Sequence, residues 1–486
     1  AWEEVAGGPT HKTFGTSSIM IGDDATGTID AANNNTGVGI DVFAALTSGD
    51  DNTAIGKGAM TANTTGGSNV AVGAIALDAN TTGVSNTAVG KGALSTATTA
   101  SSNTAMGANA LNACTTGATN TAIGGGAGES ITTGQRNVFV GIEAGATMTT
   151  GQENCYIGRL AGKLATSGYS TGVGTEALYN NTGNHNTAVG IQASNTNTSG
   201  GSNTALGALA LKTNSTGSSN VAVGYKALED FTGNNTVAVG YASLANATGS
   251  DNTGLGHQTG ENITTGTYNT CVGHNAGNTM TSPTYNTLVG YNAGQGSYPL
   301  TTGSSCTMVG ALARPSGTLG NANGENVFGF NMSASGTNTT TLGSGGSGLY
   351  ASHGSNSWTS ISDERYKKDI VDSEVGLSFI NDLRPRNFKW KTCGEVPSDT
   401  PRYEEDSDEL INPNLTGVMH GFIAQEVKAV IDNHSEVPNN QLIWKQDPDG
   451  IQGLAEGELV PVLVKAVQEL SAKNDALEAR IATLEG

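Results

Sequence analysis

Short apolar pieces recur along the first two thirds of the chain, and turn-forming polar residues separate them. The motif Asn-Thr-Ala-(Val/Ile)-Gly stands at 52–56, 86–90, 120–124 and 186–190. A second apolar piece, Ala-Leu, follows in many units, as at 93–94 and 227–228. Clusters such as Thr-Thr-Gly and Ser-Asn favour turns. The pattern therefore predicts units of two short strands and two turns.

The last glycine of the motif marks a period of 16 or 17 residues. The series runs Gly22, Gly39, Gly56, Gly73, Gly90, Gly107, Gly124, Gly141, Gly158, Gly174, Gly190, Gly207, Gly224, Gly240, Gly256, Gly273 and Gly290, and then loosens through Gly310, Gly329 and Gly343. Self-similarity at a fixed period indicates a solenoid. We expect a mostly β protein with a β-solenoid (β-roll) fibre over 15–343, after a connector over 1–14. Coils stack at ~4.8 Å, which predicts an array roughly 80 Å long.

Valine and alanine alternate in the motif, so they face opposite sides of their strand. Both are apolar. One side suits a narrow solenoid interior, where larger side chains would not fit. A coil this thin buries little apolar surface by itself. The other side is therefore expected to face a partner chain, in a homotrimer of rolls around a common axis. These repeats resemble the head repeats of trimeric autotransporter adhesins and repeat-rich phage tail fibres.

Composition changes near residue 357. The first 357 residues contain 27 charged residues and 62 glycines, whereas the last 129 contain 37 and 8. We expect a linker or cap over 344–361 and a separate domain over 362–486. The formal net charge of −20 argues against a nucleic-acid partner, which needs clustered Lys and Arg. The sequence lacks a run of ~20 apolar residues, so no membrane partner is expected. Its start, Ala1-Trp2-Glu3-Glu4, lacks the regions of a signal peptide.

The five cysteines are odd in number and no pair has CxxC spacing. They are interpreted as small buried hydrophobes, and neither metal nor cofactor is expected. Cys271 takes a position where neighbouring repeats have alanine.

Three groups of side chains leave alternatives open. The asparagines form a row that would satisfy turn backbone groups, or would bind ions or sugars; they are Asn52, Asn69, Asn86, Asn103, Asn120, Asn137 and Asn154. Threonine pairs such as Thr64-Thr65 form an array that also occurs in ice-binding solenoids. Six aromatic residues would seal the solenoid end or bind carbohydrate; they are Tyr291, Tyr298, Phe328, Phe330, Tyr350 and Trp358.

The C-terminal residues 459–486 predict a coiled coil. Apolar residues alternate three and four apart, with one asparagine at an a position, which fixes register and oligomer state. We call these residues the heptad seam: Val460, Leu463, Val467, Leu470, Asn474, Leu477, Ile481 and Leu484.

Four further motifs identify the C-terminal domain. Residues 362–370 read Ser-Asp-Glu-Arg-Tyr-Lys-Lys-Asp-Ile, followed by Leu-Arg-Pro with Phe-Lys-Trp-Lys at 383–391. His-Gly-Phe-Ile-Ala-Gln-Glu-Val stands at 420–427, and Leu-Val-Pro-Val-Leu-Val-Lys-Ala-Val-Gln-Glu-Leu at 459–470. Together they resemble the intramolecular chaperone domain of endosialidases and related phage tailspikes and fibres. The acidic, Pro-rich segment 394–416 looks like an inserted loop.

The resemblance implies a small α+β domain that trimerises the chain and then cleaves itself off. It implies a dyad of Ser362 and Lys367, a single-turnover serine–lysine autoprotease, with cleavage between Ser362 and Asp363. A serine needs a base, and a desolvated lysine can serve as one. Glu364 and Arg365 match the family motif and are expected to have structural roles. A trimerising clamp lowers the entropic barrier of a slow, non-local β assembly.

These observations favour a trimeric phage tail fibre or spike, assembled in the host cytoplasm and carried on the virion. Its expected partners are a host-surface receptor, taken to be carbohydrate, and other tail proteins. One alternative is a polysaccharide-degrading tailspike, but glycoside cleavage needs paired carboxylates, and acids are scattered in the repeats. Another alternative is a cellular trimeric adhesin, which would carry a membrane anchor after the coiled coil.

Overall fold

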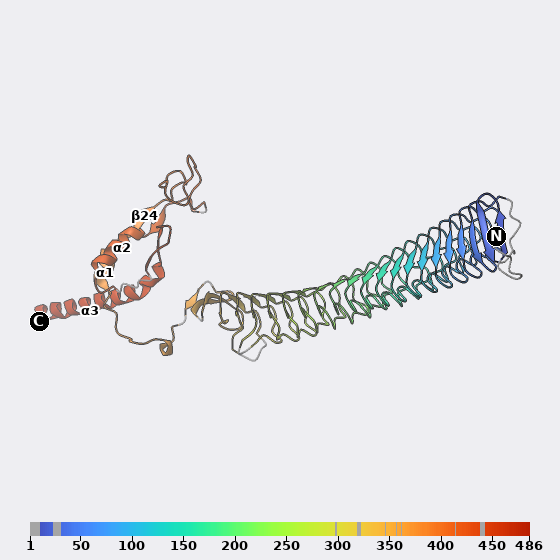
Figure 1. Ribbon diagram of the computed structural model, residues 1–486. Helices are drawn as coiled ribbons and strands as arrows, with labels where there is room; N and C mark the ends of the chain where they lie inside the picture. Colours follow the sequence, from blue (N-terminus) through green and yellow to red (C-terminus); the bar gives the residue numbers. More distant parts are fainter. Residues whose placement is uncertain are drawn as a thin grey trace. The chain divides into compact units, whose positions relative to one another are not determined.

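The computed structural model describes residues 10–22, 31–296, 299–317, 322–345, 347–355, 357–360, 362–413, 415–437 and 443–486. It contains two compact units, Ala1–Ile361 and Ser362–Gly486 (Figure 1). Each is described by itself. No helix within the described ranges combines the length and the hydropathy that crossing a bilayer requires.

The first unit is a β-solenoid, which confirms the predicted fold class. Within the described residues, strands β2 to β21 pair in parallel, each with the next in the chain. Their bounds are β2 Ser18–Gly22, β3 Thr36–Gly39, β4 Thr53–Ile55, β5 Val70–Val72, β6 Thr87–Val89, β7 Thr104–Met106, β8 Thr121–Ile123, β9 Val138–Val140, β10 Cys155–Ile157, β11 Thr171–Val173, β12 Thr187–Val189, β13 Thr204–Leu206, β14 Val221–Val223, β15 Val237–Val239, β16 Thr253–Leu255, β17 Thr270–Val272, β18 Thr287–Val289, β19 Thr307–Val309, β20 Asn326–Phe328 and β21 Thr339–Ser344.

Antiparallel strands close the sheet at both ends. β1 (Thr10–Phe14) pairs with β2, and β21 pairs with β22 (Ser347–Ser352), which pairs with β23 (Thr359–Ser360). Of the six aromatic residues predicted to seal the C-terminal end or bind carbohydrate, Tyr350 lies half-buried in β22, and the other described ones are exposed in the single chain. Phe328, Phe330 and Trp358 are exposed because they point outward from the coil, and the end is covered by the β21–β22 hairpin instead. Tyr298 lies outside the described residues.

The interior of each coil is narrow, and most central strand residues are small. The expectation that larger side chains would not fit is wrong for Phe139 in β9 and Tyr156 in β10, which are completely buried because Gly145 and Gly162 leave room for their rings. The central residue of each strand, such as Ala88, is completely buried, and its two neighbours point outward. Cys271 fills the same position in β17, and burial raises the pKa of its thiol to about 12. The described cysteines are free, and all but Cys155 are buried, as predicted.

Each coil has one strand, so the prediction of two strands per unit is wrong. The second apolar piece, Ala93-Leu94, is buried but forms turns, and Leu94 has a φ of 51°. This left-handed conformation bends the chain and cannot continue a strand. Leu94 N–H still donates to the Ala110 carbonyl of the next coil at 3.0 Å. The coil therefore closes by a strained turn whose cost is offset by stacking.

The repeat glycines form a stacked column, which explains the period. Gly90 has a φ of 136°, and a Cβ added to it would lie 2.5 Å from the Gly107 carbonyl oxygen. The same short distance recurs from coil to coil, for instance between Gly107 and Gly124 at 2.4 Å. Only glycine fits both the backbone angle and this close approach.

The predicted asparagine row is a buried ladder that satisfies the backbone. Asn86 is fully buried, and its Nδ2 donates to the Ala100 carbonyl at 2.8 Å and to Asn69 Oδ1 at 3.1 Å. Its Oδ1 accepts from the Asn103 backbone N–H at 3.1 Å. The structural interpretation is confirmed, because these side chains face the interior rather than a ligand. In the threonine row, the first member bonds to the next coil, as Thr64 Oγ1 does to the Thr81 carbonyl at 2.9 Å.

The second unit is a small α+β domain. Its elements are η1 Glu364–Tyr366, α1 Leu377–Asp382, β24 Arg386–Phe388, β25 Met419–Gly421, α2 Ala424–Asn433, β26 Trp444–Gln446, β27 Gln452–Leu454, η2 Glu456–Glu458 and α3 Leu459–Glu485 (Figure 1). Phe379 of α1, Val427 and Ile431 of α2, and Leu459 and Val462 of α3 share one apolar core. The acidic segment 394–416 belongs to the long connection in the sequence between β24 and β25, which pair with each other in antiparallel fashion.

Candidate self-cleavage site and assembly surfaces

A single turn of 3-10 helix brings the two predicted dyad residues together. Ser362 and Lys367 flank η1, and the Lys367 N–H bonds back to the Glu364 carbonyl at 2.9 Å. The chain thereby reverses, and Lys367 Nζ lies 2.8 Å from Ser362 Oγ. A hydrogen bond between nucleophile and base is the geometry that activates a serine. The catalytic role of the pair remains a prediction.

The residue after Ser362 fixes this turn. Asp363 accepts a hydrogen bond from the Arg365 backbone N–H at 2.9 Å, and so caps the N-terminus of η1. The Arg365 guanidinium also binds the Asp363 carboxylate, with Nε at 2.9 Å from Oδ1. These Arg365 hydrogen bonds lower the pKa of the Asp363 carboxyl. Arg365 thus holds the turn, which agrees with the structural role expected for it.

Both dyad side chains are exposed in the single chain. A lysine amine gives up its proton near neutral pH only when it is withdrawn from water. The geometry of the pair is therefore present, while the desolvation that such a base needs is not supplied by the described residues of one chain.

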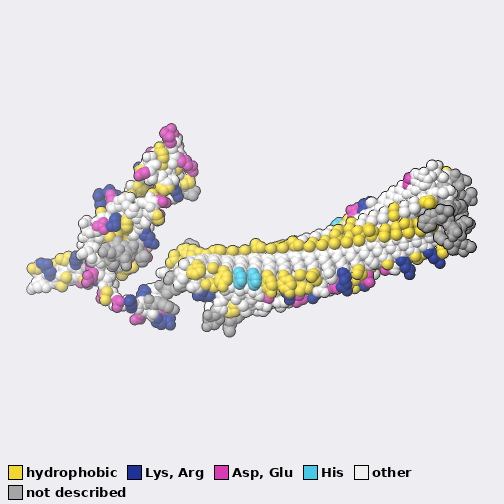
Figure 2. All heavy atoms as spheres, viewed as in Figure 1, with side chains coloured by type: hydrophobic (Ala, Val, Ile, Leu, Met, Phe, Trp, Pro, Cys, Tyr) yellow, Lys and Arg dark blue, Asp and Glu magenta, His cyan; other side chains and the backbone are white. Residues whose placement is uncertain are grey.

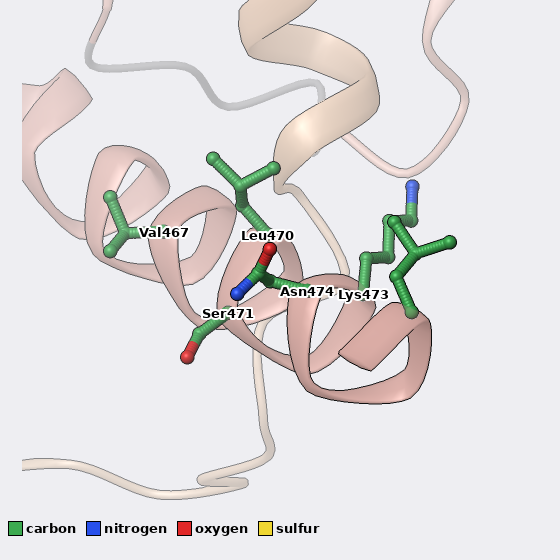
Figure 3. Close-up of a pocket in the computed structure, with 6 residues that line it drawn as sticks. Val467, Leu470, Ser471, Lys473 and Asn474 are labelled. Atoms are coloured by element: carbon green, nitrogen blue, oxygen red, sulfur yellow. The ribbon is translucent and has the colours of Figure 1, made fainter. Parts of the chain in front are cut away.

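The heptad seam lies on the exposed side of α3. Val460, Leu463, Val467 and Leu470 are between 45% and 64% exposed, whereas Leu459, Val462 and Ala466 face the domain core. Asn474 is exposed as well, and its Nδ2 donates to Glu478 Oε1 at 2.9 Å. In Figure 3, Val467, Leu470 and Asn474 project from successive turns of the helix. The seam is thus free to meet other copies of α3.

A charged side chain ties α3 to α1. Glu469 Oε2 accepts from the Leu377 N–H at 2.9 Å, at the start of α1. The same carboxylate leaves no room beside Gly376, where an added Cβ would lie 2.6 Å from Glu469 Oε1. Sequence analysis missed this residue, because nothing local links positions 92 residues apart.

The outer face of the solenoid carries an uninterrupted apolar row, which we call the outer stripe. It consists of the residue that precedes each repeat glycine, and Figure 2 shows a yellow band along the solenoid. Its members are Ile21, Val38, Ile55, Val72, Val89, Met106, Ile123, Val140, Ile157, Val173, Val189, Leu206, Val223, Val239, Leu255, Val272, Val289, Val309, Phe328 and Leu342. The row contains no polar or charged residue, although exposure reaches 48% at Leu206 and Leu255. Long exposed apolar patches mark interaction surfaces.

A second row, which sequence analysis missed, contains stacked rings. It comprises the residue that follows each repeat glycine, and in five consecutive coils this residue is aromatic or histidine: Tyr225, Tyr241, His257, His274 and Tyr291. Successive ring centroids lie 5.6, 4.8, 4.8 and 5.5 Å apart. We call these five residues the ring ladder. The sequence signal for this row is an aromatic residue or histidine directly after the repeat glycine in consecutive units. It is easily overlooked, because other units have unrelated residues at that position.

A β-solenoid fibre with a separate C-terminal α+β domain defines the class of protein. Residues 362–436 match the family model described as chaperone of endosialidase. No curated protein and no solved structure matches the chain. The C-terminal region is therefore a chaperone domain of the endosialidase type, which implies trimer formation. Joined to a β-solenoid, it fits a trimeric protein of the tail-fibre or tailspike kind.

Proposed function

We propose that this chain forms a homotrimeric phage tail fibre or spike that attaches the virion to a carbohydrate on the host surface. The observation that carries the proposal is the outer stripe, which runs the length of a solenoid whose C-terminal domain belongs to a trimerising family. Three copies packed stripe to stripe would remove this apolar surface from water. At about 25 cal/mol per Å², such burial stabilises an assembly that one thin coil cannot stabilise alone.

The chaperone domain would start this assembly and then leave it. The heptad seam would hold three chains in register while the parallel strands, which pair slowly, form from one end. Assembly would also cover Ser362 and Lys367, and so supply the missing desolvation. Hydrolysis of the Ser362–Asp363 bond would then release the domain. Without the chaperone domain that starts assembly, an unfolded fibre would refold slowly, so the assembled fibre would be kinetically trapped.

The assembly surface is tested by light scattering and intact mass of the chain. The parent is expected as a trimer of the fragment that ends at Ser362, and therefore below three times the 49.0 kDa of the whole chain. A triple variant of the outer stripe, Ile55→Asp, Ile123→Asp and Leu206→Asp, is expected to give no such cleaved trimer, because packing its stripes together would bury nine carboxylates around one axis. Its uncleaved chains can still associate through the heptad seam. The matched control keeps the trimer, since its residues are similarly exposed but lie outside the stripe; it is Ile75→Asp, Val84→Asp and Leu164→Asp. A cleaved trimer from both triple variants contradicts the stripe as interface.

Self-cleavage is tested by the denatured intact mass of the same chains. The parent is expected to yield a fragment ending at Ser362, and Ser362→Ala and Lys367→Ala to stay whole. The stripe variant is expected to stay whole too, because its solenoids do not assemble and its dyad remains in water. If the parent stays whole, the dyad proposal is wrong, and the domain is a permanent trimerisation cap.

A further inference from the structure

The ring ladder is a built feature rather than a chance grouping of aromatics. Its rungs occupy one position in five consecutive coils, and Ala208 and Ala311 take that position on either side. His257 and His274 are parallel to within 4°, and Tyr241 and His257 to within 11°. Figure 2 shows histidine side chains in line with a second band of apolar side chains along the solenoid.

The rings leave part of their faces open to a ligand. Close contact between stacked carbon atoms occurs at about 3.5–4.0 Å. Parallel rings with centroids 4.8 Å apart must therefore be slipped sideways past each other. Tyr225, Tyr241 and Tyr291 are 43%, 46% and 53% exposed. The ladder thus presents a row of partial ring faces, hydroxyl groups and imidazole nitrogens.

Polar but uncharged side chains accompany the rungs. Gln258, Asn275 and Asn292 directly follow His257, His274 and Tyr291 in the sequence. Of the charged groups next to them, Lys226 is paired with Glu229 at 3.0 Å, whereas Glu261 accepts from the Gln258 and Asn278 amides at 2.9 and 3.1 Å and keeps its negative charge. The surface around the ladder therefore disfavours an acidic ligand and is suited to hydrogen-bonding a neutral one.

The residues that occupy the same position in coils nearer the N-terminus indicate that the ladder lies outside the trimer interface. Lys57, Lys91 and Arg159 occupy the position after the repeat glycine in other coils, and all three are exposed. Three chains that buried this column would take these charges out of water as well, which is strongly unfavourable. The outer stripe has no such members.

We propose that the ring ladder binds a linear, uncharged polysaccharide that lies along the fibre, with one sugar unit on each rung. The inference rests on the proposed attachment function and locates its receptor site. A periodic ligand can use successive rungs only if its own repeat matches theirs. An extended peptide advances at most 3.3–3.6 Å per residue, which falls out of step with rungs 4.8–5.6 Å apart. The length of one pyranose unit is close to the rung spacing. Pyranose rings also offer apolar faces to the aromatic rings and hydroxyls to the amides.

The test compares two double variants of the full-length chain. Tyr241→Ser with Tyr291→Ser removes two rungs. The control, Tyr268→Ser with Tyr285→Ser, removes two tyrosines that are stacked at 5.0 Å and are 51% and 62% exposed. These control residues lie in the turns that precede β17 and β18, at the opposite ends of the strands from the ladder. Light scattering and intact mass establish first that both variants assemble and mature like the parent.

Binding is measured on immobilised linear oligosaccharides, both neutral (glucans, mannans, galactans and xylans) and acidic (sialic and uronic acid polymers), and on bacterial cells. We expect the parent to bind a neutral glycan, the ladder variant to bind it at least tenfold more weakly, and the control to bind it like the parent. Equal binding by the ladder variant and the parent overturns the ladder site but leaves attachment standing. Binding only to acidic glycans, or to no glycan, overturns the ligand class. A parent that adsorbs to no cells instead rejects the attachment function itself.

Discussion

The buried asparagine ladder allows a quantitative prediction at Asn86. Replacement by alanine removes the partner of the Ala100 carbonyl and of the Asn103 N–H, which lie 2.8 and 3.1 Å from the Asn86 side chain. Ala100 and Asn103 are at most 1% exposed, so water cannot replace the lost partner without opening the coil. Each buried group left unpaired costs about 1–3 kcal/mol, so Asn86→Ala is expected to lower the free energy of unfolding by about 2–6 kcal/mol per chain.

The assay is denaturation in guanidinium chloride, followed by far-UV circular dichroism, with both substitutions made in the Ser362→Ala chain, which keeps its chaperone domain and so can refold. The matched control is Asn262→Ala, because Asn262 is exposed and its Nδ2 makes a solvent-accessible bond to the Asn278 carbonyl at 2.8 Å. The control is expected to change the free energy of unfolding by about 1 kcal/mol or less. A loss below about 1 kcal/mol for Asn86→Ala would refute the account of the ladder as the backbone's partner.

Two further predictions concern the glycine column and the chaperone domain. Gly90→Ala is expected to lower the unfolding midpoint of the solenoid, because the new Cβ would meet the Gly107 carbonyl oxygen at 2.5 Å and positive φ adds about 1–3 kcal/mol of strain; Gly125→Ala, whose nearest contact is 3.9 Å away, should leave the midpoint unchanged. His434 is bound by Glu436 at 2.6 Å and Asp382 at 2.9 Å, and these bonds raise its pKa above the usual 6.5. Its protonated form therefore stabilises the domain fully below pH 6.5, and this stabilisation is lost as pH rises through the raised pKa. Hydrogen exchange in α2 should then accelerate, beyond its intrinsic pH dependence, in the parent but not in His434→Gln; a parallel response in both would contradict this role.

The repeat could be predicted from the sequence because each of its key positions has one physical solution. Only glycine fits at Gly90, and the position of Ala88 is apolar and buried in coil after coil, so their period is visible without a structure. Leu94 shows the limit of this reasoning. A leucine at a φ of 51° goes against its local preference, and closure of the whole coil imposes it. The second apolar piece therefore has a strand-like composition but forms a turn.

The functional residues also divide into those that the sequence predicts and those that only the structure reveals. The pairing of Ser362 with Lys367 follows from a short segment, since a single turn of 3-10 helix lies within the four residues between them. The ring ladder depends on contacts across coils, and its position holds Lys57, Ala74 or Lys91 elsewhere. Such a row becomes visible only when the coils are stacked in register. Glu469, which caps a helix 92 residues away, requires the folded domain.

The glycine column also makes fibre length an adjustable quantity. Each coil offers the next coil the same backbone surface that it receives from the previous one, so units of 16 and 17 residues follow one another without loss of register. Duplication or loss of one unit would change the reach of the fibre by about 4.8 Å and leave both ends as they are. Recombination between units can thus change the length of the fibre in small, equal increments, without redesign of the fold.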